Sequence, residues 1–215
     1  MIALVDYGAG NLTSVRKALS SLGAEFLVPE SPELCAAAEG LIVPGVGHFA
    51  STSRLDAPWR AAIADAVHSG TPLLGICVGM QWLFAGSDEA PDVPGIGLLP
   101  GQVERLRGDA AQRLKIPHVG WNALDFTGAS SRLLHGVESG AHVYFTHSYA
   151  APVTTDCAAS STHADAFSAV VERGNIFGVQ FHPEKSSDAG LQILRNFIAV
   201  CGCRPRASRH DRQRC

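Results

Sequence analysis

A cysteine set between two glycines is the residue of this chain best suited to covalent chemistry. Cys77 lies in Gly75-Ile76-Cys77-Val78-Gly79, after the apolar run Pro72-Leu73-Leu74 and before Met80-Gln81-Trp82. This order predicts a strand, a sharp turn that carries the sulfur at its apex, and then a helix. The glycines would keep side chains away from the turn, and the helix N-terminus would favour a thiolate. The alternative is a buried, unreactive cysteine.

A base that could activate this thiol lies far downstream. His182 follows Val179-Gln180-Phe181, and Glu184 comes two residues later. Residues i and i+2 of an extended segment face the same side, so Glu184 could fix the ring of His182 and stabilise its imidazolium form. We therefore expect Cys77, His182 and Glu184 to act as nucleophile, base and orienting group. Three other histidines compete for the role of base, namely His48, His118 and His147. None of them has a carboxylate two residues away.

Acyl transfer also needs donors that stabilise an oxyanion. The N–H group of Val78, directly after the cysteine, is one candidate. A second would come from Pro44-Gly45-Val46-Gly47, whose glycines would let the backbone N–H groups of Val46 and Gly47 approach a substrate closely. Taken alone, this segment could equally be an ordinary strand-to-helix turn.

The first half of the chain alternates apolar strands with helical segments. This alternation predicts a parallel sheet that would position the catalytic residues and the oxyanion donors. Leu12, Val15, Leu19 and Leu22 recur at helical spacing, and Asn11 is a candidate N-cap. Near-continuous apolar strands indicate a sheet that helices cover on both faces. The strands are expected at residues 2–5, 26–28, 41–43 and 73–76.

The second half predicts antiparallel strands at residues 103–106 and 143–149, and a hairpin of 166–172 and 176–181 around Gly174-Asn175. A closing helix carries one apolar stripe: Leu191, Leu194, Phe197 and Ile198. The chain therefore predicts an α/β fold with a mostly parallel central sheet, flanking helices and an antiparallel extension. It forms one domain over residues 1–201, followed by an arginine-rich tail over 202–215. We expect this tail to be disordered, although a partner-binding or nucleic-acid-binding arm is an alternative.

Composition excludes several classes of function. The chain has 215 residues, of which 46% are hydrophobic and 17% charged, and its net charge is -3. This balance predicts neither nucleic acid nor a membrane as a partner. The N-terminus lacks the features of a signal peptide, and the six cysteines lack a disulfide-framework spacing, so we expect a cytoplasmic protein with reduced thiols. Cys201-Gly202-Cys203 has no second ligand pair, so no metal site and no cofactor are expected.

Three blocks of the sequence resemble the signature blocks of class I glutamine amidotransferases, which have a flavodoxin-like fold. The resemblance covers residues 1 to about 200 and rests on Pro44–Gly47, Gly75–Gln81 and Gly178–Ser186. Within this class, further segments are similar to the glutaminase subunit of imidazole glycerol phosphate synthase. These segments are Asp6-Tyr7-Gly8-Ala9-Gly10-Asn11, Pro117-His118-Val119-Gly120-Trp121-Asn122 and Tyr144-Phe145-Thr146-His147-Ser148-Tyr149.

The resemblance implies that L-glutamine is hydrolysed to glutamate and ammonia through a thioester on Cys77. Ammonia would pass to a (β/α)8-barrel synthase subunit in a heterodimer. That subunit would form imidazole glycerol phosphate, for histidine biosynthesis, and an aminoimidazole carboxamide ribotide. Reorientation of Val46 and Gly47 would complete the oxyanion hole only when the synthase is loaded. Further implied roles are substrate binding by Gly45, Gln81, His147, Ser148 and Tyr149, and partner contact by Asn11, Trp121, Tyr144 and Lys185.

Other functions remain open from the sequence. A sister amidotransferase could feed anthranilate, guanylate or pyridoxal phosphate synthesis, but the blocks around Trp121 and Tyr144 favour the histidine branch. A catalytically silent regulatory module would lack a member of the triad, and all three members are present. A stand-alone cysteine hydrolase would leave Gly120-Trp121-Asn122 and Lys185-Ser186 without a role.

Overall fold

A computed structural model describes residues 1–108 and 114–202, which form an α/β fold around one large sheet. The order of its strands is β2-β1-β3-β4-β13-β12-β11-β8. The first five strands are parallel to one another and the last three are antiparallel, so the predicted fold class is confirmed. The strands of this sheet are β1 (Ile2–Leu4), β2 (Phe26–Leu27), β3 (Gly40–Gly45), β4 (Leu73–Cys77), β8 (Asp125–Phe126), β11 (Cys157–His163), β12 (Asp165–Arg173) and β13 (Ile176–Val179).

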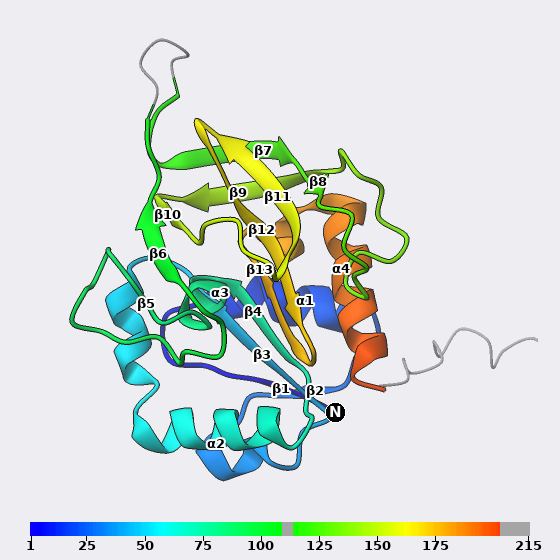
Figure 1. Cartoon of the computed structure of the whole chain (residues 1–215). Coiled ribbons are helices and arrows are strands. Elements are labelled where there is room, and N and C mark those ends of the chain that lie inside the picture. Colours follow the sequence, from blue (N-terminus) through cyan, green and yellow to red (C-terminus); the bar gives the residue numbers. More distant parts are fainter. Residues whose placement is uncertain (109–113, 203–215) are drawn as a thin grey trace, which may run out of the picture.

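Helices cover the sheet, and two small sheets extend it. In Figure 1, α2 crosses the lower front of the molecule, whereas α1 and α4 lie behind the strands. The α-helices are α1 (Leu12–Ser21), α2 (Ala57–His68), α3 (Val78–Trp82) and α4 (Ser187–Val200), and the 3-10 helices are η1 (Pro32–Cys35), η2 (Phe49–Arg54) and η3 (Pro183–Lys185). The small sheets contain β5 (Gly86–Ser87), β6 (Gln102–Arg105) and β10 (Tyr149–Ala150), and β7 (His118–Ala123) with β9 (His142–His147).

The central strands are apolar on both faces because both faces are covered. Every residue of β3 and of β4 is buried. The same holds for β13, which pairs with β4 from Ile176↔Leu73 to Val179↔Ile76. Strands of this kind carry continuous apolar runs rather than alternating ones. Their carboxyl ends meet at one edge of the sheet, where loops far apart in the sequence come together.

The antiparallel half differs in detail from the sequence prediction. The hairpin at Gly174-Asn175 forms as expected, but its second strand ends at Val179 rather than at residue 181. The expected strand 143–149 is two strands, β9 and β10, which belong to different small sheets. Ser148 lies between them, and its carbonyl accepts from the N–H of Leu106 beside β6. The pattern gave no signal for β7 or β11, which carry mixed polar and apolar residues.

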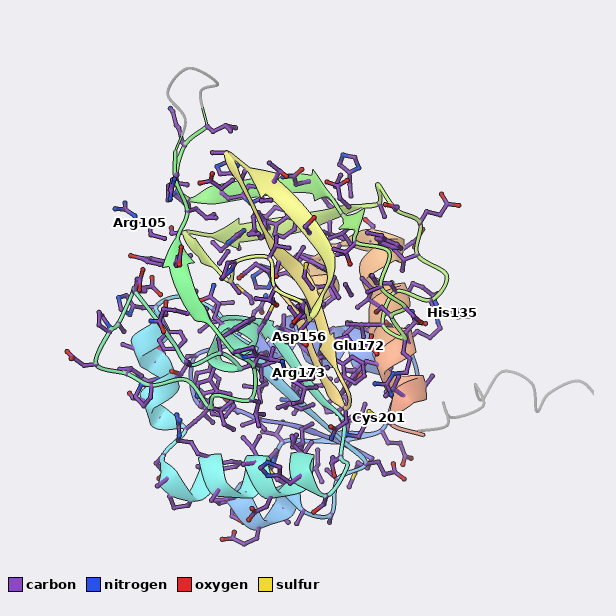
Figure 2. The ribbon with its side chains drawn as sticks, in the orientation of Figure 1. Arg105, His135, Asp156, Glu172, Arg173 and Cys201 are labelled. Atoms are coloured by element: carbon purple, nitrogen blue, oxygen red, sulfur yellow. The ribbon has the colours of Figure 1, made fainter. Side chains whose placement is uncertain are left out.

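Charged pairs fix the end of β12 to the loops around it. Figure 2 shows Asp156, Glu172 and Arg173 close together in this region. Arg173 binds both carboxylate oxygens of Asp156, with Nε to Oδ1 at 3.0 Å and one terminal nitrogen to Oδ2 at 2.9 Å. Glu172 accepts from Ser131 Oγ at 2.7 Å and from Arg132 Nε at 2.8 Å. These contacts hold the long connection between β8 and β9 against the main sheet.

Three further expectations concern a helix cap, membrane-spanning helices and the C-terminal tail. Asn11 stands at the N-cap position of α1, as expected, but its side chain makes no capping hydrogen bond. In the part of the chain that the structure describes, no helix is long and apolar enough to cross a membrane. The predicted disorder of the tail concerns residues 202–215, of which all but Gly202 lie outside the described residues.

Candidate active site

Cys77 occupies a strained turn between β4 and α3. It is the last residue of β4, its side chain is buried, and its backbone has φ 54° and ψ −111°. A positive φ is costly for a residue with a Cβ atom, and such strain clusters at functional sites. The helix that follows has only five residues, so its overall dipole is weak. The individual N–H groups of its first turn are therefore the relevant polar groups, because the helix itself leaves them unpaired.

The flanking glycines allow α3 to pack directly against two strands. A Cβ atom on Gly79 would overlap the carbonyl oxygen of Val43 in β3. One on Gly75 would lie 2.6 Å from the carbonyl oxygen of Gly79. Both approaches are to backbone atoms, which cannot move aside as a flexible side chain could. Both positions therefore need glycine, as expected at this turn, because backbone segments are in direct contact there.

His182 and Glu184 follow the neighbouring strand, β13, which ends at Val179. His182 Nδ1 is 2.9 Å from Glu184 Oε1, and each side chain is only 1% exposed. Their pairing does not come from the extended i, i+2 geometry that the sequence suggested, because Pro183–Lys185 forms the 3-10 helix η3. Two bonds fix the backbone of His182: its N–H donates to Tyr144 O, and its carbonyl accepts from Ser186 Oγ at 2.6 Å.

The surroundings of His182 favour its protonated form. Burial alone lowers the pKa of His182, but hydrogen bonds and charge interactions with Cys77 and Glu184 outweigh burial and raise the pKa to about 9. Glu184 occupies Nδ1, so the interaction with Cys77 falls to Nε2. Within the described residues, Nε2 has no conventional hydrogen-bond partner. The ring therefore lies between a carboxylate and the sulfur.

The competing histidines make hydrogen bonds that hold the fold together. Nδ1 of His48 accepts the N–H of Ala50 and caps η2. His118 and His147 form a buried pair, with Nδ1 of the first 3.0 Å from Nε2 of the second. Burial lowers the pKa of His118 to about 4 and that of His147 to about 3, so both are neutral at pH 7. His182 is the histidine whose pKa is raised.

A cavity of about 390 Å³ opens above the sulfur. Its walls come from loops that are distant in sequence: Asn11, Val46, Gly47, Cys77, Val78, Gln81, Glu89, Pro117, Thr146, His147, Ser148, Tyr149, His182 and Lys185. Four residues with an implied role in substrate binding are among them, namely Gln81, His147, Ser148 and Tyr149. Gly45 is not on the wall, and a Cβ atom at this position would overlap the Tyr7 hydroxyl, Val78 and Gly79.

The expected oxyanion donors all line the cavity but differ in their hydrogen bonding. Val78 begins α3 and lines the cavity, as do Val46 and Gly47. However, the N–H of Val46 donates to Ala9 O at 2.9 Å, so it points at the loop after β1 rather than at a substrate. Gly47 has φ +84° and open space around its α-carbon. Pro44 and Gly45 are thus held by pairing with β4, and Val46 is held by its bond to Ala9.

Of the four residues with an implied role in partner contact, two line this cavity and two are linked to it through ring contacts. Asn11 and Lys185 contribute to the wall itself. Trp121 is 51% exposed, and its ring centroid is 6.1 Å from that of Tyr144. Lys185 Nζ lies 6.0 Å from the Tyr144 ring. Val119, on the same strand as Trp121, is also exposed. These residues, which we call the rim patch (Asn11, Val119, Trp121, Tyr144 and Lys185), form an aromatic and basic surface.

Sequence reasoning missed one charged residue of the cavity. Glu89 is the only carboxylate among the described residues that line it. Its Oε2 accepts the N–H of Phe49 at 2.7 Å, which holds the loop after β5 against η2. Glu89 follows no recognisable strand or motif in the sequence. Only the folding back of this loop places it in the same cavity as the nucleophile.

The fold and this site define a class of protein, and comparison with known proteins agrees. The chain belongs to the class-I glutamine amidotransferases, whose family model matches residues 3–201. Two solved structures share the fold. A crystal structure of a glutamine amidotransferase superposes with a TM-score of 0.71 at 21% identity, over 94% of this chain and 98% of that one. The PurLQS structure from Thermotoga maritima gives a TM-score of 0.64 at 19% identity, over 92% and 97%.

Curated relatives place the chain more narrowly, among the proteins named imidazole glycerol phosphate synthase subunit HisH. The relative from Halalkalibacterium halodurans is 48% identical over 206 residues, which are 93% of this chain and 96% of that one. The relative from Gloeobacter violaceus is 46% identical, over 96% and 92%. The relative from Natronomonas pharaonis is 43% identical, over 93% and 94%.

Proposed function

We propose that this chain is the glutaminase subunit of an imidazole glycerol phosphate synthase. The observation that carries this proposal is the meeting of Cys77, at the end of β4, with the His182–Glu184 pair, which follows the adjacent strand β13. Cys77 and His182 both line one cavity. The similarity to HisH subunits supports the choice of pathway. The sister branches keep the same fold, but the segments around Trp121 and Tyr144 and the identity of the relatives favour the histidine branch.

In the proposed reaction, the Cys77 thiolate attacks the side-chain amide carbon of glutamine. A carbon–sulfur bond forms, and His182 donates a proton to the departing nitrogen, which leaves as ammonia. Water then gives a proton to His182 and attacks the thioester. The carbon–sulfur bond breaks, its electron pair returns to sulfur, and glutamate is released. Glu184 holds the His182 ring and stabilises its positive charge throughout.

Recognition of glutamine would depend on the walls of the cavity. Glu89 is placed to take the α-ammonium group, because it is the only acidic lining residue among those described. The backbone of His147–Tyr149 and the amide of Gln81 would bound the amino acid on the opposite side. The small volume of the cavity fits one amino acid rather than a larger substrate.

The oxyanion segment is in a resting arrangement in this proposal. Val78 N–H is one donor, but Val46 N–H is engaged with Ala9 O and must turn before it can stabilise an oxyanion. A partner that shifts the loop after β1 would release it, so glutaminase activity would depend on the synthase. Equal glutaminase rates with and without a nucleotide-loaded synthase subunit would rule out this gating.

The proposed partner is a (β/α)8-barrel synthase subunit that binds the rim patch in a heterodimer and receives ammonia. This subunit would form imidazole glycerol phosphate and an aminoimidazole carboxamide ribotide. A cytoplasmic location belongs to the same proposal, because Cys35, Cys77 and Cys157 are free thiols and suit a reducing compartment.

The decisive experiment separates ammonia production from ammonia use. In the purified complex, Cys77→Ser should abolish synthesis with glutamine, whereas added ammonium should still support synthesis at the wild-type rate. Loss of both activities would show that Cys77 is needed for assembly rather than for glutamine hydrolysis.

A further inference from the structure

The sulfur of Cys77 has a second polar neighbour that the triad does not include. Gln180 follows β13, two residues before His182, and its side chain is completely buried. Its amide nitrogen Nε2 donates to Cys77 Sγ at 3.7 Å. Burying an amide costs free energy unless each of its polar atoms has a hydrogen-bond partner. A buried amide next to a reactive sulfur therefore points to a function.

The hydrogen-bond network fixes which end of this amide faces the sulfur. The carbonyl oxygen of Tyr149 can only accept, so the group that contacts it at 2.8 Å must be Nε2 of Gln81. The same Gln81 nitrogen donates to Oε1 of Gln180 at 3.1 Å. With its oxygen held in this way, Gln180 must present its N–H₂ group to Cys77. Two amides in series therefore aim a donor at the sulfur.

The anchor of this network is itself held from the other side. His147 Nδ1 lies 2.9 Å from the carbonyl oxygen of Tyr149, so it must carry the hydrogen of that bond. Nε2 of His147 is then an acceptor, and it faces Nδ1 of His118 at 3.0 Å. Both rings are buried. The position of the Tyr149 carbonyl is therefore set by β9 and β7, independently of Gln180.

We propose that Gln180 is a further catalytic residue, which holds the Cys77 thiolate through its amide N–H while His182 holds it through its ring. This inference rests on the proposed function for its reaction, although not for its geometry. A donor bonds more strongly to an anion than to a neutral acceptor. Gln180 therefore stabilises the thiolate before attack, and again when the thioester breaks and sulfur recovers its electron pair.

The first test removes the donor and keeps the volume. Gln180→Met has a side chain of similar size but no N–H, and Gln81 keeps its bond to Tyr149. We expect alkylation of Cys77 by iodoacetamide in the full-length chain to slow by about tenfold at pH 7. The pH at which the rate is half-maximal should rise. Gln192→Met, on α4 and away from the cavity, is the matched control and should react like wild type.

A second variant changes only the orientation of Gln180. Gln81→Met removes the bond that holds Gln180 Oε1, so the amide can turn its oxygen toward the sulfur. Alkylation should again slow, even though Gln180 is present. If either variant folds, as judged by circular dichroism, and keeps the wild-type alkylation rate and pH profile, the inference is wrong.

Glutamine turnover distinguishes this inference from the proposed function. In the complex, Gln180→Met should lower the glutaminase kcat by about tenfold and leave KM for glutamine within about twofold. A wild-type complex without glutaminase activity would overturn the proposed function. The alkylation rates would still test whether Gln180 stabilises the Cys77 thiolate. A glutaminase-active complex that Gln180→Met leaves unchanged would overturn the inference alone.

Discussion

At the scale of single residues, the site depends on where one proton resides. Glu184 and Cys77 both interact with the ring of His182, and their combined effect exceeds the cost of burying a charged imidazole. His182 is therefore an imidazolium at neutral pH. In the proposed reaction it begins as the acid that protonates the departing ammonia, and it becomes the base in the hydrolytic half.

This arrangement predicts a pH-dependent contribution of His182 to stability. The pKa of His182 is about 9 in the folded chain, and the ordinary value in the unfolded chain is 6.5. Its stabilising contribution is complete below pH 6.5 and is lost as the pH rises through 9. Between these values the free energy of unfolding should fall by up to about 1.4 kcal/mol per pH unit, relative to His182→Asn. Urea unfolding of both proteins from pH 6 to 10 measures this, and parallel curves would contradict it.

Glu89 provides a prediction on substrate recognition. Glu89→Gln keeps an oxygen that can accept the N–H of Phe49, but it loses the negative charge. We expect KM for glutamine to rise by about tenfold or more, because a charge-assisted bond to the α-ammonium group would be lost. Synthesis from ammonium should not change. Steady-state kinetics with each nitrogen source decide this, and an unchanged KM would remove Glu89 from the binding site.

At the scale of elements, the contact of α3 with β3 sets the geometry of the nucleophile. The short helix sits on the strand without a side chain between them, because residue 79 is glycine. The same contact fixes the turn at Cys77 and orients the first N–H groups of α3. A small displacement of the helix would therefore move the sulfur and the Val78 donor together.

A methyl group at this contact should be poorly tolerated. We expect Gly79→Ala to lower the free energy of unfolding by about 3 kcal/mol or more, since its Cβ atom meets the backbone of Val43. Gly140→Ala is the comparison, because Gly140 has φ +88° but nothing within 4 Å of the position that a Cβ atom would take. That variant should cost only the backbone strain of about 1–2 kcal/mol. Equal losses in urea unfolding would show that the contact with β3 is unimportant.

At the scale of the whole molecule, the cavity and the rim patch share one end of the fold. Figure 1 shows β7 and β9 at the top of the view, whereas α2 lies at the bottom. The His118–His147 pair of this two-stranded ribbon faces inward, and Trp121 and Val119 are exposed. A partner that binds the rim patch would therefore contact the same ribbon that holds the Tyr149 carbonyl.

Trp121 should contribute strongly to association with the synthase subunit. Exposed tryptophans at interfaces often account for about 2 kcal/mol or more, so Trp121→Ala should raise the Kd by about thirtyfold or more. Leu34→Ala is the control, because Leu34 is also exposed but belongs to η1, which packs with α2. Titration calorimetry with the isolated synthase subunit measures both. Similar affinities for the two variants would place the interface elsewhere.

The sequence alone predicted several strands and the turn at Cys77, because the signals for these features are local. The apolar runs predicted β1, β3, β4 and the hairpin of β12 and β13, and the glycines around Cys77 predicted the turn between β4 and α3. Local signals of this kind arise from backbone conformation and from burial on both faces. The sequence also predicted that Cys77, His182 and Glu184 act together, whereas the parallel pairing of β4 with β13, which places the ends of these strands side by side, came from the structure.

Only the tertiary structure decided the features that depend on contacts between distant segments. The split of 143–149 into β9 and β10, the placement of Glu89 in the cavity and the engagement of Val46 with Ala9 O have no local signal. Gln180 is one more case, because its orientation follows from Tyr149 and Gln81 and not from its own neighbours. The sequence determined which groups could react. Packing decided which hydrogen bonds hold them, because those partners come from strands and loops far apart along the chain.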